Sequence, residues 1–181
     1  MHVKPDIAIL GAAESGVGAA LLAQKQGMNV WVSDSGIIKS EYKQQLSQAG
    51  IAFEEETHTE EIIFQAATVV KSPGLLGKAP IVQGIKSQGV GLISEIEVAS
   101  RYFDGKIVAI TGSNGKTTVT SLTYEIIKAA GLNVGMAGNI GTSFAAQLTT
   151  GEARDIYVLE VSSFQLDDIA SFKPHIAILT N

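Results

Sequence analysis

A glycine turn followed by lysine and threonine, near the middle of the chain, has the residue types of a phosphate-binding loop. Gly112 and Gly115 permit a tight turn whose backbone N–H groups can face a phosphate. Lys116 adds a mobile positive charge, and the Thr117 hydroxyl can reach a Mg²⁺ ion. An apolar run at 107–110 predicts a buried strand before the turn. The apolar spacing after it predicts a helix, whose free N–H groups and dipole favour an anion there.

The loop differs from the commonest phosphate-binding motif in the position of one glycine. That motif requires glycine five residues before Gly115, where this chain has Ile110, and the additional glycine stands at Gly112 instead. A glycine turn without a ligand is the alternative interpretation. We favour phosphate binding because Gly-Lys-Thr-Thr after a buried strand is a specific combination. The residues predicted to surround the phosphate are Ser113, Asn114, Gly115, Lys116, Thr117 and Thr118.

A glutamate lies in a second apolar run, at 155–161. Glu160 stands near the carboxyl end of this predicted strand, and a buried carboxylate is costly unless it is paired or coordinates a cation. Beside a phosphate loop the expected cation is Mg²⁺, with Thr117 and Glu160 as its ligands. We therefore predict Lys116 and Glu160 as catalytic residues. A buried acid that accepts only backbone N–H groups is the alternative.

A second glycine turn lies near the start of the chain. Gly11 and Gly16 follow a predicted strand at 7–10, and Asp34 comes about 20 residues later, as in a nucleotide-binding Rossmann half. Ala13 stands where the dinucleotide fingerprint has glycine. A nucleotide or nucleotide-sugar is the favoured ligand, and an NAD-type cofactor or no ligand are the alternatives.

The order of predicted elements indicates an α/β fold. Strands at 28–32, 51–53, 68–71 and 91–93 alternate with helices at 41–49, 60–67 and 80–88. This alternation predicts a Rossmann-like doubly wound parallel sheet over 1–103. The first part of a P-loop α/β ATP-binding domain is expected over 104–181. A helix at 94–103, with Ser94 as its cap and Glu97 completing a capping box, would end the first domain.

Composition excludes several classes of function. The 181 residues carry a net charge of −5, so no overall basic field is available to hold nucleic acid. The chain has no cysteine, which excludes thiolate catalysis and is compatible with a reducing cytoplasm. No run approaches the roughly 18 apolar residues of a membrane span. The acidic cluster at 54–56, near His58, is interpreted as a solvated edge rather than a metal site.

Three motifs together resemble the Mur ligases of peptidoglycan synthesis. They are Thr-Gly-Ser-Asn-Gly-Lys-Thr-Thr at 111–118, Gly-Asn-Ile-Gly at 138–141 and Leu-Glu-Val-Ser-Ser-Phe-Gln-Leu at 159–166. The first domain adds an Asp after the glycine turn and a Ser-Pro-Gly at 72–74, as that family does. The resemblance spans essentially the whole chain, and it explains the displaced loop glycine because the family uses this variant.

The resemblance implies roles for particular residues. The first domain would hold a uridine diphosphate sugar, and the middle of the chain would hold ATP, with Lys116 on its outer phosphates and Thr117 and Glu160 on Mg²⁺. The implied sugar-nucleotide residues are Glu14 and Ser15 in the glycine turn, Asp34 and Ser35 at the uracil and ribose, Gly74 beside the diphosphate, and Asn139 and Ser162 at the sugar-peptide end. Ala13 and Glu14 depart from the family pattern and leave the diphosphate contacts open.

The implied reaction is ATP-dependent amide formation through an acyl phosphate, in the cytoplasm. The Asn-Ile-Gly and Ser-Ser-Phe-Gln motifs favour UDP-N-acetylmuramoyl-L-alanine and D-glutamate as the substrates. We expect a monomer with neither nucleic acid nor membrane as a partner. Family members continue past Asn181, so the chain is expected to be an amino-terminal portion that binds ligands without turnover.

Other classes of protein account for less of the sequence. A P-loop GTPase or kinase would leave the first domain unexplained, and the Asn-Lys-x-Asp guanine motif does not occur. An NAD-dependent oxidoreductase would leave the phosphate loop without a role. A purely structural nucleotide-binding module remains as a third alternative.

Overall fold

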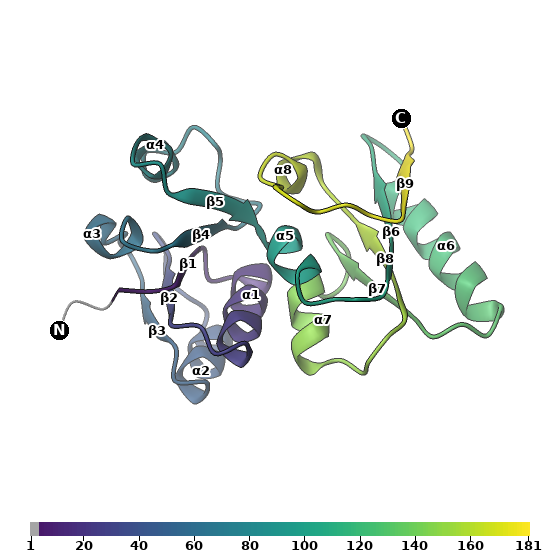
Figure 1. Cartoon of the computed structure of the whole chain (residues 1–181), viewed down its shortest axis with the longest axis horizontal. Coiled ribbons are helices and arrows are strands. Elements are labelled where there is room, and N and C mark those ends of the chain that lie inside the picture. Colours follow the sequence, from purple (N-terminus) through teal and green to yellow (C-terminus); the bar gives the residue numbers. More distant parts are fainter. Residues whose placement is uncertain (1–3) are drawn as a thin grey trace.

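Two parallel β-sheets, each flanked by helices, make up the molecule. The structure, a computed structural model, describes residues 4–181. One sheet has five strands in the order β3-β2-β1-β4-β5, and the other has four in the order β7-β8-β6-β9 (Figure 1). All strand pairs are parallel. The predicted α/β class and the doubly wound first sheet are therefore confirmed.

The first unit alternates strands and helices as the sequence predicted. Its elements are β1 (Ile7–Leu10), α1 (Glu14–Lys25), β2 (Val30–Ser33), α2 (Ser40–Gln48), β3 (Ala52–Glu54), α3 (Glu60–Ile63), β4 (Thr68–Lys71), α4 (Pro80–Ser87), β5 (Gly91–Ser94) and α5 (Glu95–Ser100). The central strand β1 pairs with β2 on one side and β4 on the other. The strand order therefore reverses at β1, and its carboxyl end opens into the crevice where ligands of such sheets bind.

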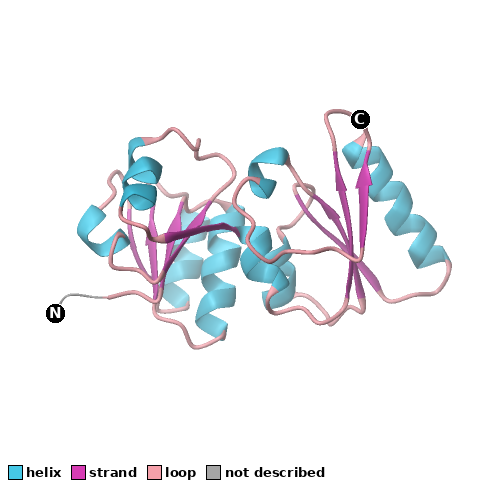
Figure 2. Cartoon of the chain, turned by 45° about the horizontal axis from the view of Figure 1, so that its top comes forward, coloured by secondary structure: helices cyan, strands magenta, loops and turns pink. Residues whose placement is uncertain are grey.

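Both faces of the first sheet are covered, because successive residues of β1 point to opposite faces. Ile7 and Ile9 pack with α1 and α2, whereas Ala8 and Leu10 pack with α3 and α4. Figure 2 shows the sheet between these two helical layers. Continuous apolar strands such as Ile-Ala-Ile-Leu are what a sheet buried on both faces requires.

The second unit is built around the strand that precedes the phosphate loop. Its elements are β6 (Lys106–Thr111), α6 (Lys116–Ala129), β7 (Val134–Gly138), α7 (Phe144–Thr150), β8 (Ile156–Glu160), α8 (Ser163–Leu166) and β9 (Ile176–Leu179). Strand β6 lies between β8 and β9, so its carboxyl end is again a point where the strand order reverses.

Helices α1, α5 and α7 lie between the two sheets (Figures 1 and 2). A single hydrophobic cluster runs through this layer, from Ile9 and Ala20 in the first unit to Phe144 and Tyr157 in the second. The rings of Phe103, Phe144 and Tyr157 pack edge to face, with centroids 5.0–5.6 Å apart. The two units therefore share one core. The predicted boundary between 103 and 104 remains a prediction.

Some local predictions were wrong. Helix α3 ends at Ile63 instead of 67. Ser94 caps α5 by accepting from the Glu97 N–H (3.4 Å), but the reciprocal half of the capping box is absent, because the Ser94 N–H donates to the Asp168 carbonyl. The helix predicted after the phosphate loop is present as α6, although two of its apolar side chains, Leu122 and Ile126, are exposed. No helix in residues 4–181 is long and apolar enough to span a membrane.

Candidate functional site

The turn from β6 into α6 carries backbone N–H donors and one lysine. Gly112 and Gly115 both have positive φ (138° and 78°), and a side chain at Gly112 would overlap the Thr180 hydroxyl. Only glycine permits this turn without strain. The N–H groups of Ser113 and Asn114 donate to Asn181 Oδ1, at 3.1 and 2.9 Å. Both donors can therefore converge on one oxygen, as they must for a phosphate.

Lys116, the first residue of α6, folds back over the same turn. Its Nζ donates to the carbonyl oxygens of Gly112 (2.7 Å) and Ser113 (3.2 Å). The positive charge thus lies over the loop, at the amino end of a 14-residue helix whose dipole also favours an anion. The loop, the start of the helix and the lysine therefore lie together, as the predicted phosphate site requires.

Glu160 lies at the end of β8, beside the start of α6. It is 3% exposed, and its two oxygens accept hydrogen bonds from different elements. Thr117 Oγ1 donates to Oε2 (2.7 Å), and Asn139 Nδ2 donates to Oε1 (3.1 Å). Thr117 and Glu160, the two predicted Mg²⁺ ligands, are hydrogen-bonded to each other, and Asn139 joins them.

These oxygen atoms fit a magnesium ion that also binds phosphate. Mg²⁺ prefers hard oxygen ligands and usually takes only one or two carboxylates, the rest being waters and substrate phosphates. The Thr117 hydroxyl and the Glu160 carboxylate supply such atoms next to the loop. Within residues 4–181 no group of three or more His, Asp or Glu side chains could hold a metal by itself. The Thr117 and Glu160 oxygen atoms are ligands of the type that Mg²⁺ prefers.

A separate cavity of about 440 Å³ opens at the carboxyl ends of β1, β2 and β4. The predicted residues Ser15, Asp34, Ser35 and Gly74 line it. Gly11, Ala13, Ser72 and Pro73, from the glycine turn and the Ser-Pro-Gly motif, also line it, as do His58 and Leu75, which sequence reasoning did not connect with a ligand. Asp34 braces the glycine turn, because its Oδ2 accepts the Ala12 N–H (2.6 Å) while its Oδ1 accepts the Gly36 N–H (2.8 Å).

His58 and Glu54 belong to this end of the sheet, although the sequence placed them on a solvated edge. Ser33 Oγ lies 2.6 Å from His58 Nδ1 and 2.7 Å from Glu54 Oε1. Glu54 also accepts from the Thr59 N–H (2.8 Å). The acidic cluster is therefore partly structural, and His58 faces the cavity. The Glu-Glu-Glu run gave no sign of this, because only the fold brings Ser33 beside it.

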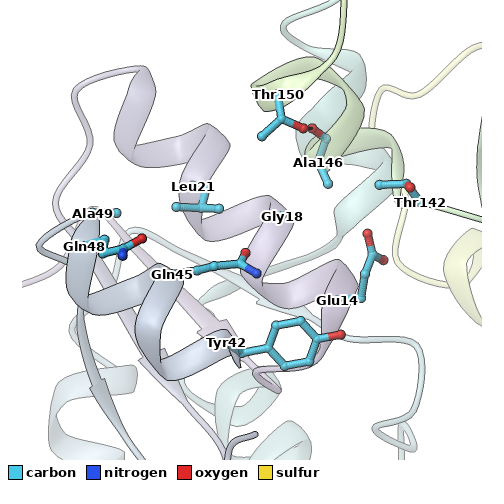
Figure 3. A pocket seen from close by; sticks show the side chains of 10 residues that line it. All are labelled: Glu14, Gly18, Leu21, Tyr42, Gln45, Gln48, Ala49, Thr142, Ala146 and Thr150. Carbon is cyan, nitrogen blue, oxygen red and sulfur yellow. Dashed lines mark hydrogen bonds between the residues drawn. The ribbon is translucent and has the colours of Figure 1, made fainter. Parts of the chain in front are cut away.

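Glu14 lies in a different place from the other predicted sugar-nucleotide residues. It lines a cavity of about 630 Å³ between α1, α2 and α7, where its carboxylate points toward Thr142 (Figure 3). Its Oε1 accepts the Ser143 N–H (2.8 Å), so the residue bridges the two units. Ser162 caps α8 in a complete capping box with Gln165, and Thr118 is exposed on the first turn of α6.

One buried ion pair and the buried carboxylate of Glu97 connect the two units, and sequence reasoning did not identify them. Lys71 Nζ lies 2.9 Å from Asp168 Oδ2, with both side chains largely buried. Glu97 is fully buried and accepts hydrogen bonds from the N–H groups of Ala170, Ser171 and Phe172. The only signal in the sequence was a Ser-Glu-Ile-Glu start to a helix, which reads as a helix cap and not as an interface.

Sequence profiles of two known domains match the two units. The profile described as the MurD N-terminal domain matches residues 7–80, and the profile described as the Mur ligase middle domain matches residues 110–181. The chain belongs to the Mur ligase family. The second profile covers the phosphate loop, Asn139 and Glu160, and the first covers the residues of the 440 Å³ cavity.

Curated relatives extend the match along nearly the whole chain. The UDP-N-acetylmuramoylalanine--D-glutamate ligase of Bacteroides fragilis is 55% identical over 97% of this chain, and that of Porphyromonas gingivalis is 50% identical over 99%. The ligase of the same name from Chlorobaculum parvum is 41% identical over 97%. The chain spans only 38–40% of the length of these relatives.

Solved structures of Mur ligases share the fold. A UDP-N-acetylmuramate:L-alanyl-gamma-D-glutamyl-meso-diaminopimelate ligase from Neisseria meningitides superposes with a TM-score of 0.60 at 22% identity, over 98% of this chain and 60% of that one. The UDP-N-acetylmuramate-alanine ligase MurC from Thermotoga maritima gives a TM-score of 0.58 at 19% identity, over 98% of this chain and 41% of that one. The arrangement of two parallel sheets is thus that of the Mur ligases.

Proposed function

We propose that this chain is the nucleotide-binding part of an ATP-dependent ligase that adds D-glutamate to UDP-N-acetylmuramoyl-L-alanine. The observation that carries the proposal is the cluster at the phosphate loop, where the Thr117 hydroxyl and the Asn139 amide converge on Glu160. The name of the 55% identical Bacteroides fragilis relative supports the choice of substrates.

At the phosphate loop, each group of the chain has a definite role in this proposal. The N–H groups of the loop and Lys116 hold the outer phosphates of ATP, while Thr117 and Glu160 hold Mg²⁺. When bound, the metal supplies positive charge to phosphate oxygens. Transfer of a phosphoryl group to the alanyl carboxylate brings anions together, so placing positive groups and N–H dipoles around them is what favours the reaction.

In the first unit, the 440 Å³ cavity is the proposed sugar-nucleotide site. Ser15, in the first turn of α1, and Gly74, in the loop after β4, would approach the diphosphate, and Asp34 and Ser35 would lie on the uracil and ribose side. Asn139 then reaches the sugar-peptide end from the second unit. D-glutamate binding and turnover are proposed for a longer protein. This 181-residue chain is expected to bind without turnover, as a cytoplasmic monomer, and D-glutamate-dependent phosphate release by it would contradict this.

A titration of the chain with ATP in the presence of Mg²⁺ tests the phosphate-loop assignment. Lys116→Ala removes a charged donor from the phosphates, so we expect affinity to fall by about tenfold to a hundredfold. Lys128→Ala is the matched control, because it removes the same charge at the far end of the same helix and should bind as the wild type does. Equal affinity of all three proteins would contradict the assignment.

A further inference from the structure

The amino end of α7 is held by two carboxylates that come from the other unit. Glu14, the first residue of α1, accepts the Ser143 N–H at 2.8 Å. Glu95, the first residue of α5, accepts the Ala145 N–H at 2.5 Å. The Ser143 hydroxyl accepts the Ala146 N–H, at 3.4 Å. The position of α7 is therefore set by side chains of the first unit as well as by its own cap.

The turn that leads into α7, residues 138–143, is fixed at its other end by Glu160. The Asn139 N–H donates to the Glu160 carbonyl (2.8 Å), and the Asn139 side chain donates to the Glu160 carboxylate (3.1 Å). Gly138 has φ of 104°, and a side chain there would overlap the Glu160 backbone. A further hydrogen bond closes the turn, from the Gly138 N–H to the Thr142 carbonyl (3.2 Å).

This short turn therefore connects the two carboxylates to the cluster at the phosphate loop. A six-residue turn that is hydrogen-bonded at both ends has little freedom, so moving Ser143 must move Asn139. Asn139 and Thr117 are the side chains that orient the two oxygens of Glu160. Partners that orient a metal ligand commonly change metal affinity when they are removed.

The side chain of Glu95 is enclosed where it contacts the amino end of α7, whereas the side chain of Glu14 is partly exposed. Glu95 is 1% exposed, and its Oε2 has no hydrogen-bond partner among residues 4–181. Glu14 is half-buried at the rim of the 630 Å³ cavity, where Figure 3 shows it beside Thr142. Ser15, its neighbour in sequence, lines the sugar-nucleotide cavity. Glu14 is thus the member of the pair whose removal leaves the core intact.

We propose that Glu14 and Glu95 are positioning residues for the metal-binding end of the nucleotide site, acting through the 138–143 turn on Asn139 and Glu160. The part of this inference that concerns metal affinity rests on the proposed function. The part that concerns the turn does not, because it follows from the contacts of the chain alone. A measurement on the chain without nucleotide tests the turn, and a Mg²⁺ titration tests the metal affinity.

The first measurement uses the chain without nucleotide. In NMR spectra, the Asn139 side-chain amide of the wild type should show one proton protected from solvent exchange by its bond to Glu160. Glu14→Ala should remove that protection, whereas Glu14→Gln, which keeps an acceptor for the Ser143 N–H, should retain it. Glu152→Ala is the control, since this carboxylate of the same unit is exposed and pairs with Arg154 instead of the turn. Unchanged protection in Glu14→Ala would overturn the proposal.

The second measurement is a Mg²⁺ titration of the ATP-saturated chain. Glu14→Ala should weaken Mg²⁺ binding by about tenfold, and Glu14→Gln and Glu95→Gln by much less, because both amides still accept an N–H. In an Asn139→Ala background, Glu14→Ala should have no further effect, since the residue through which it acts is gone.

A purely structural role of Glu14 would lower thermal stability without this dependence on Asn139. Additive effects of the two substitutions on Mg²⁺ affinity would overturn the proposal. Failure of the wild type to bind ATP would count against the proposed function alone, and the NMR result would still decide the role of Glu14.

Discussion

Glu160 shows how one buried side chain can define a site. A carboxylate in an apolar strand must be compensated, and here the compensation comes from two neutral donors, Thr117 and Asn139. No lysine or arginine of residues 4–181 forms an ion pair with it. Its negative charge is therefore available to a cation, unlike that of Glu97, which pairs with Arg101.

Glu95 and Glu97 lie in the same short helix, yet their local environments shift the pKa values of their carboxyl groups in opposite directions. Burial raises the pKa of Glu95 to about 7, because the N–H groups of Ala145 and Phe144 offset only part of its cost and the Glu14 charge adds to it. Burial acts on Glu97 too, but hydrogen bonds from Ser171 and from the N–H groups of 170–172 outweigh it and lower the pKa to about 2.

The low pKa of Glu97 predicts how stability depends on pH. A carboxyl group whose pKa is lower in the folded state adds stability that is fully present above the unfolded value of 4.5. That contribution, about 3 kcal/mol, is lost as the pH falls toward 2. We expect Glu97→Gln to lower the free energy of unfolding at pH 7 by about this amount and by little at pH 2, as measured by urea denaturation.

Glu152→Gln is the control for this prediction, because its carboxylate is exposed and should contribute little at any pH. A loss of stability for Glu97→Gln that did not vary with pH would show that the charge of Glu97 is not the cause.

Glu95→Gln should behave in the opposite way to Glu97→Gln. Since ionised Glu95 opposes folding as the pH rises from 4.5 through 7, the amide should be neutral at low pH and stabilising above pH 7.

At the scale of elements, the packing of α1 against α7 depends on a glycine. A Cβ at Gly18 would lie 2.7 Å from the Ser143 hydroxyl and 3.0 Å from the Ala146 N–H nitrogen. Gly18→Leu should therefore push α7 away and lower the free energy of unfolding by about 1–3 kcal/mol. Thermal unfolding measures this change.

Gly77→Leu is the matched control for Gly18→Leu, because nothing lies within 4 Å of the added Cβ. It should unfold close to the wild-type temperature. Equal stability of the two variants would mean that the helices can separate without cost, and the close packing at Gly18 would then have no energetic role.

The elements were largely predictable, because their signals are local. The apolar runs of β1 and β6, the glycines at 112 and 115 and the Ser94 cap all appear in the structure where the sequence placed them. The grouping of the candidate site residues at two sheet edges was also predictable, since parallel strands bring their carboxyl ends to one edge. The role of Glu14 as a bridge to Ser143 was not predictable, because it depends on how two units pack. The buried role of Glu97 was missed for the same reason.

At the scale of the whole molecule, the shared core predicts that the two units unfold together. The hydrophobic cluster joins the first sheet to Phe144 and Tyr157, and Glu97 and Lys71 bind the 168–172 segment of the second unit. We expect a single cooperative transition in differential scanning calorimetry, with equal calorimetric and van't Hoff enthalpies. Two separated transitions would show that the interface contributes little.

Binding of the sugar nucleotide tests the account most directly. The chain would be titrated by calorimetry with UDP-N-acetylmuramoyl-L-alanine and, in parallel, with NAD. We predict saturable binding of the sugar nucleotide at one site. Asp34→Ala should weaken this binding, because it removes the carboxylate that accepts the Ala12 and Gly36 N–H groups. Binding of NAD in place of the sugar nucleotide would contradict the assignment of the first unit and, with it, the proposed ligase.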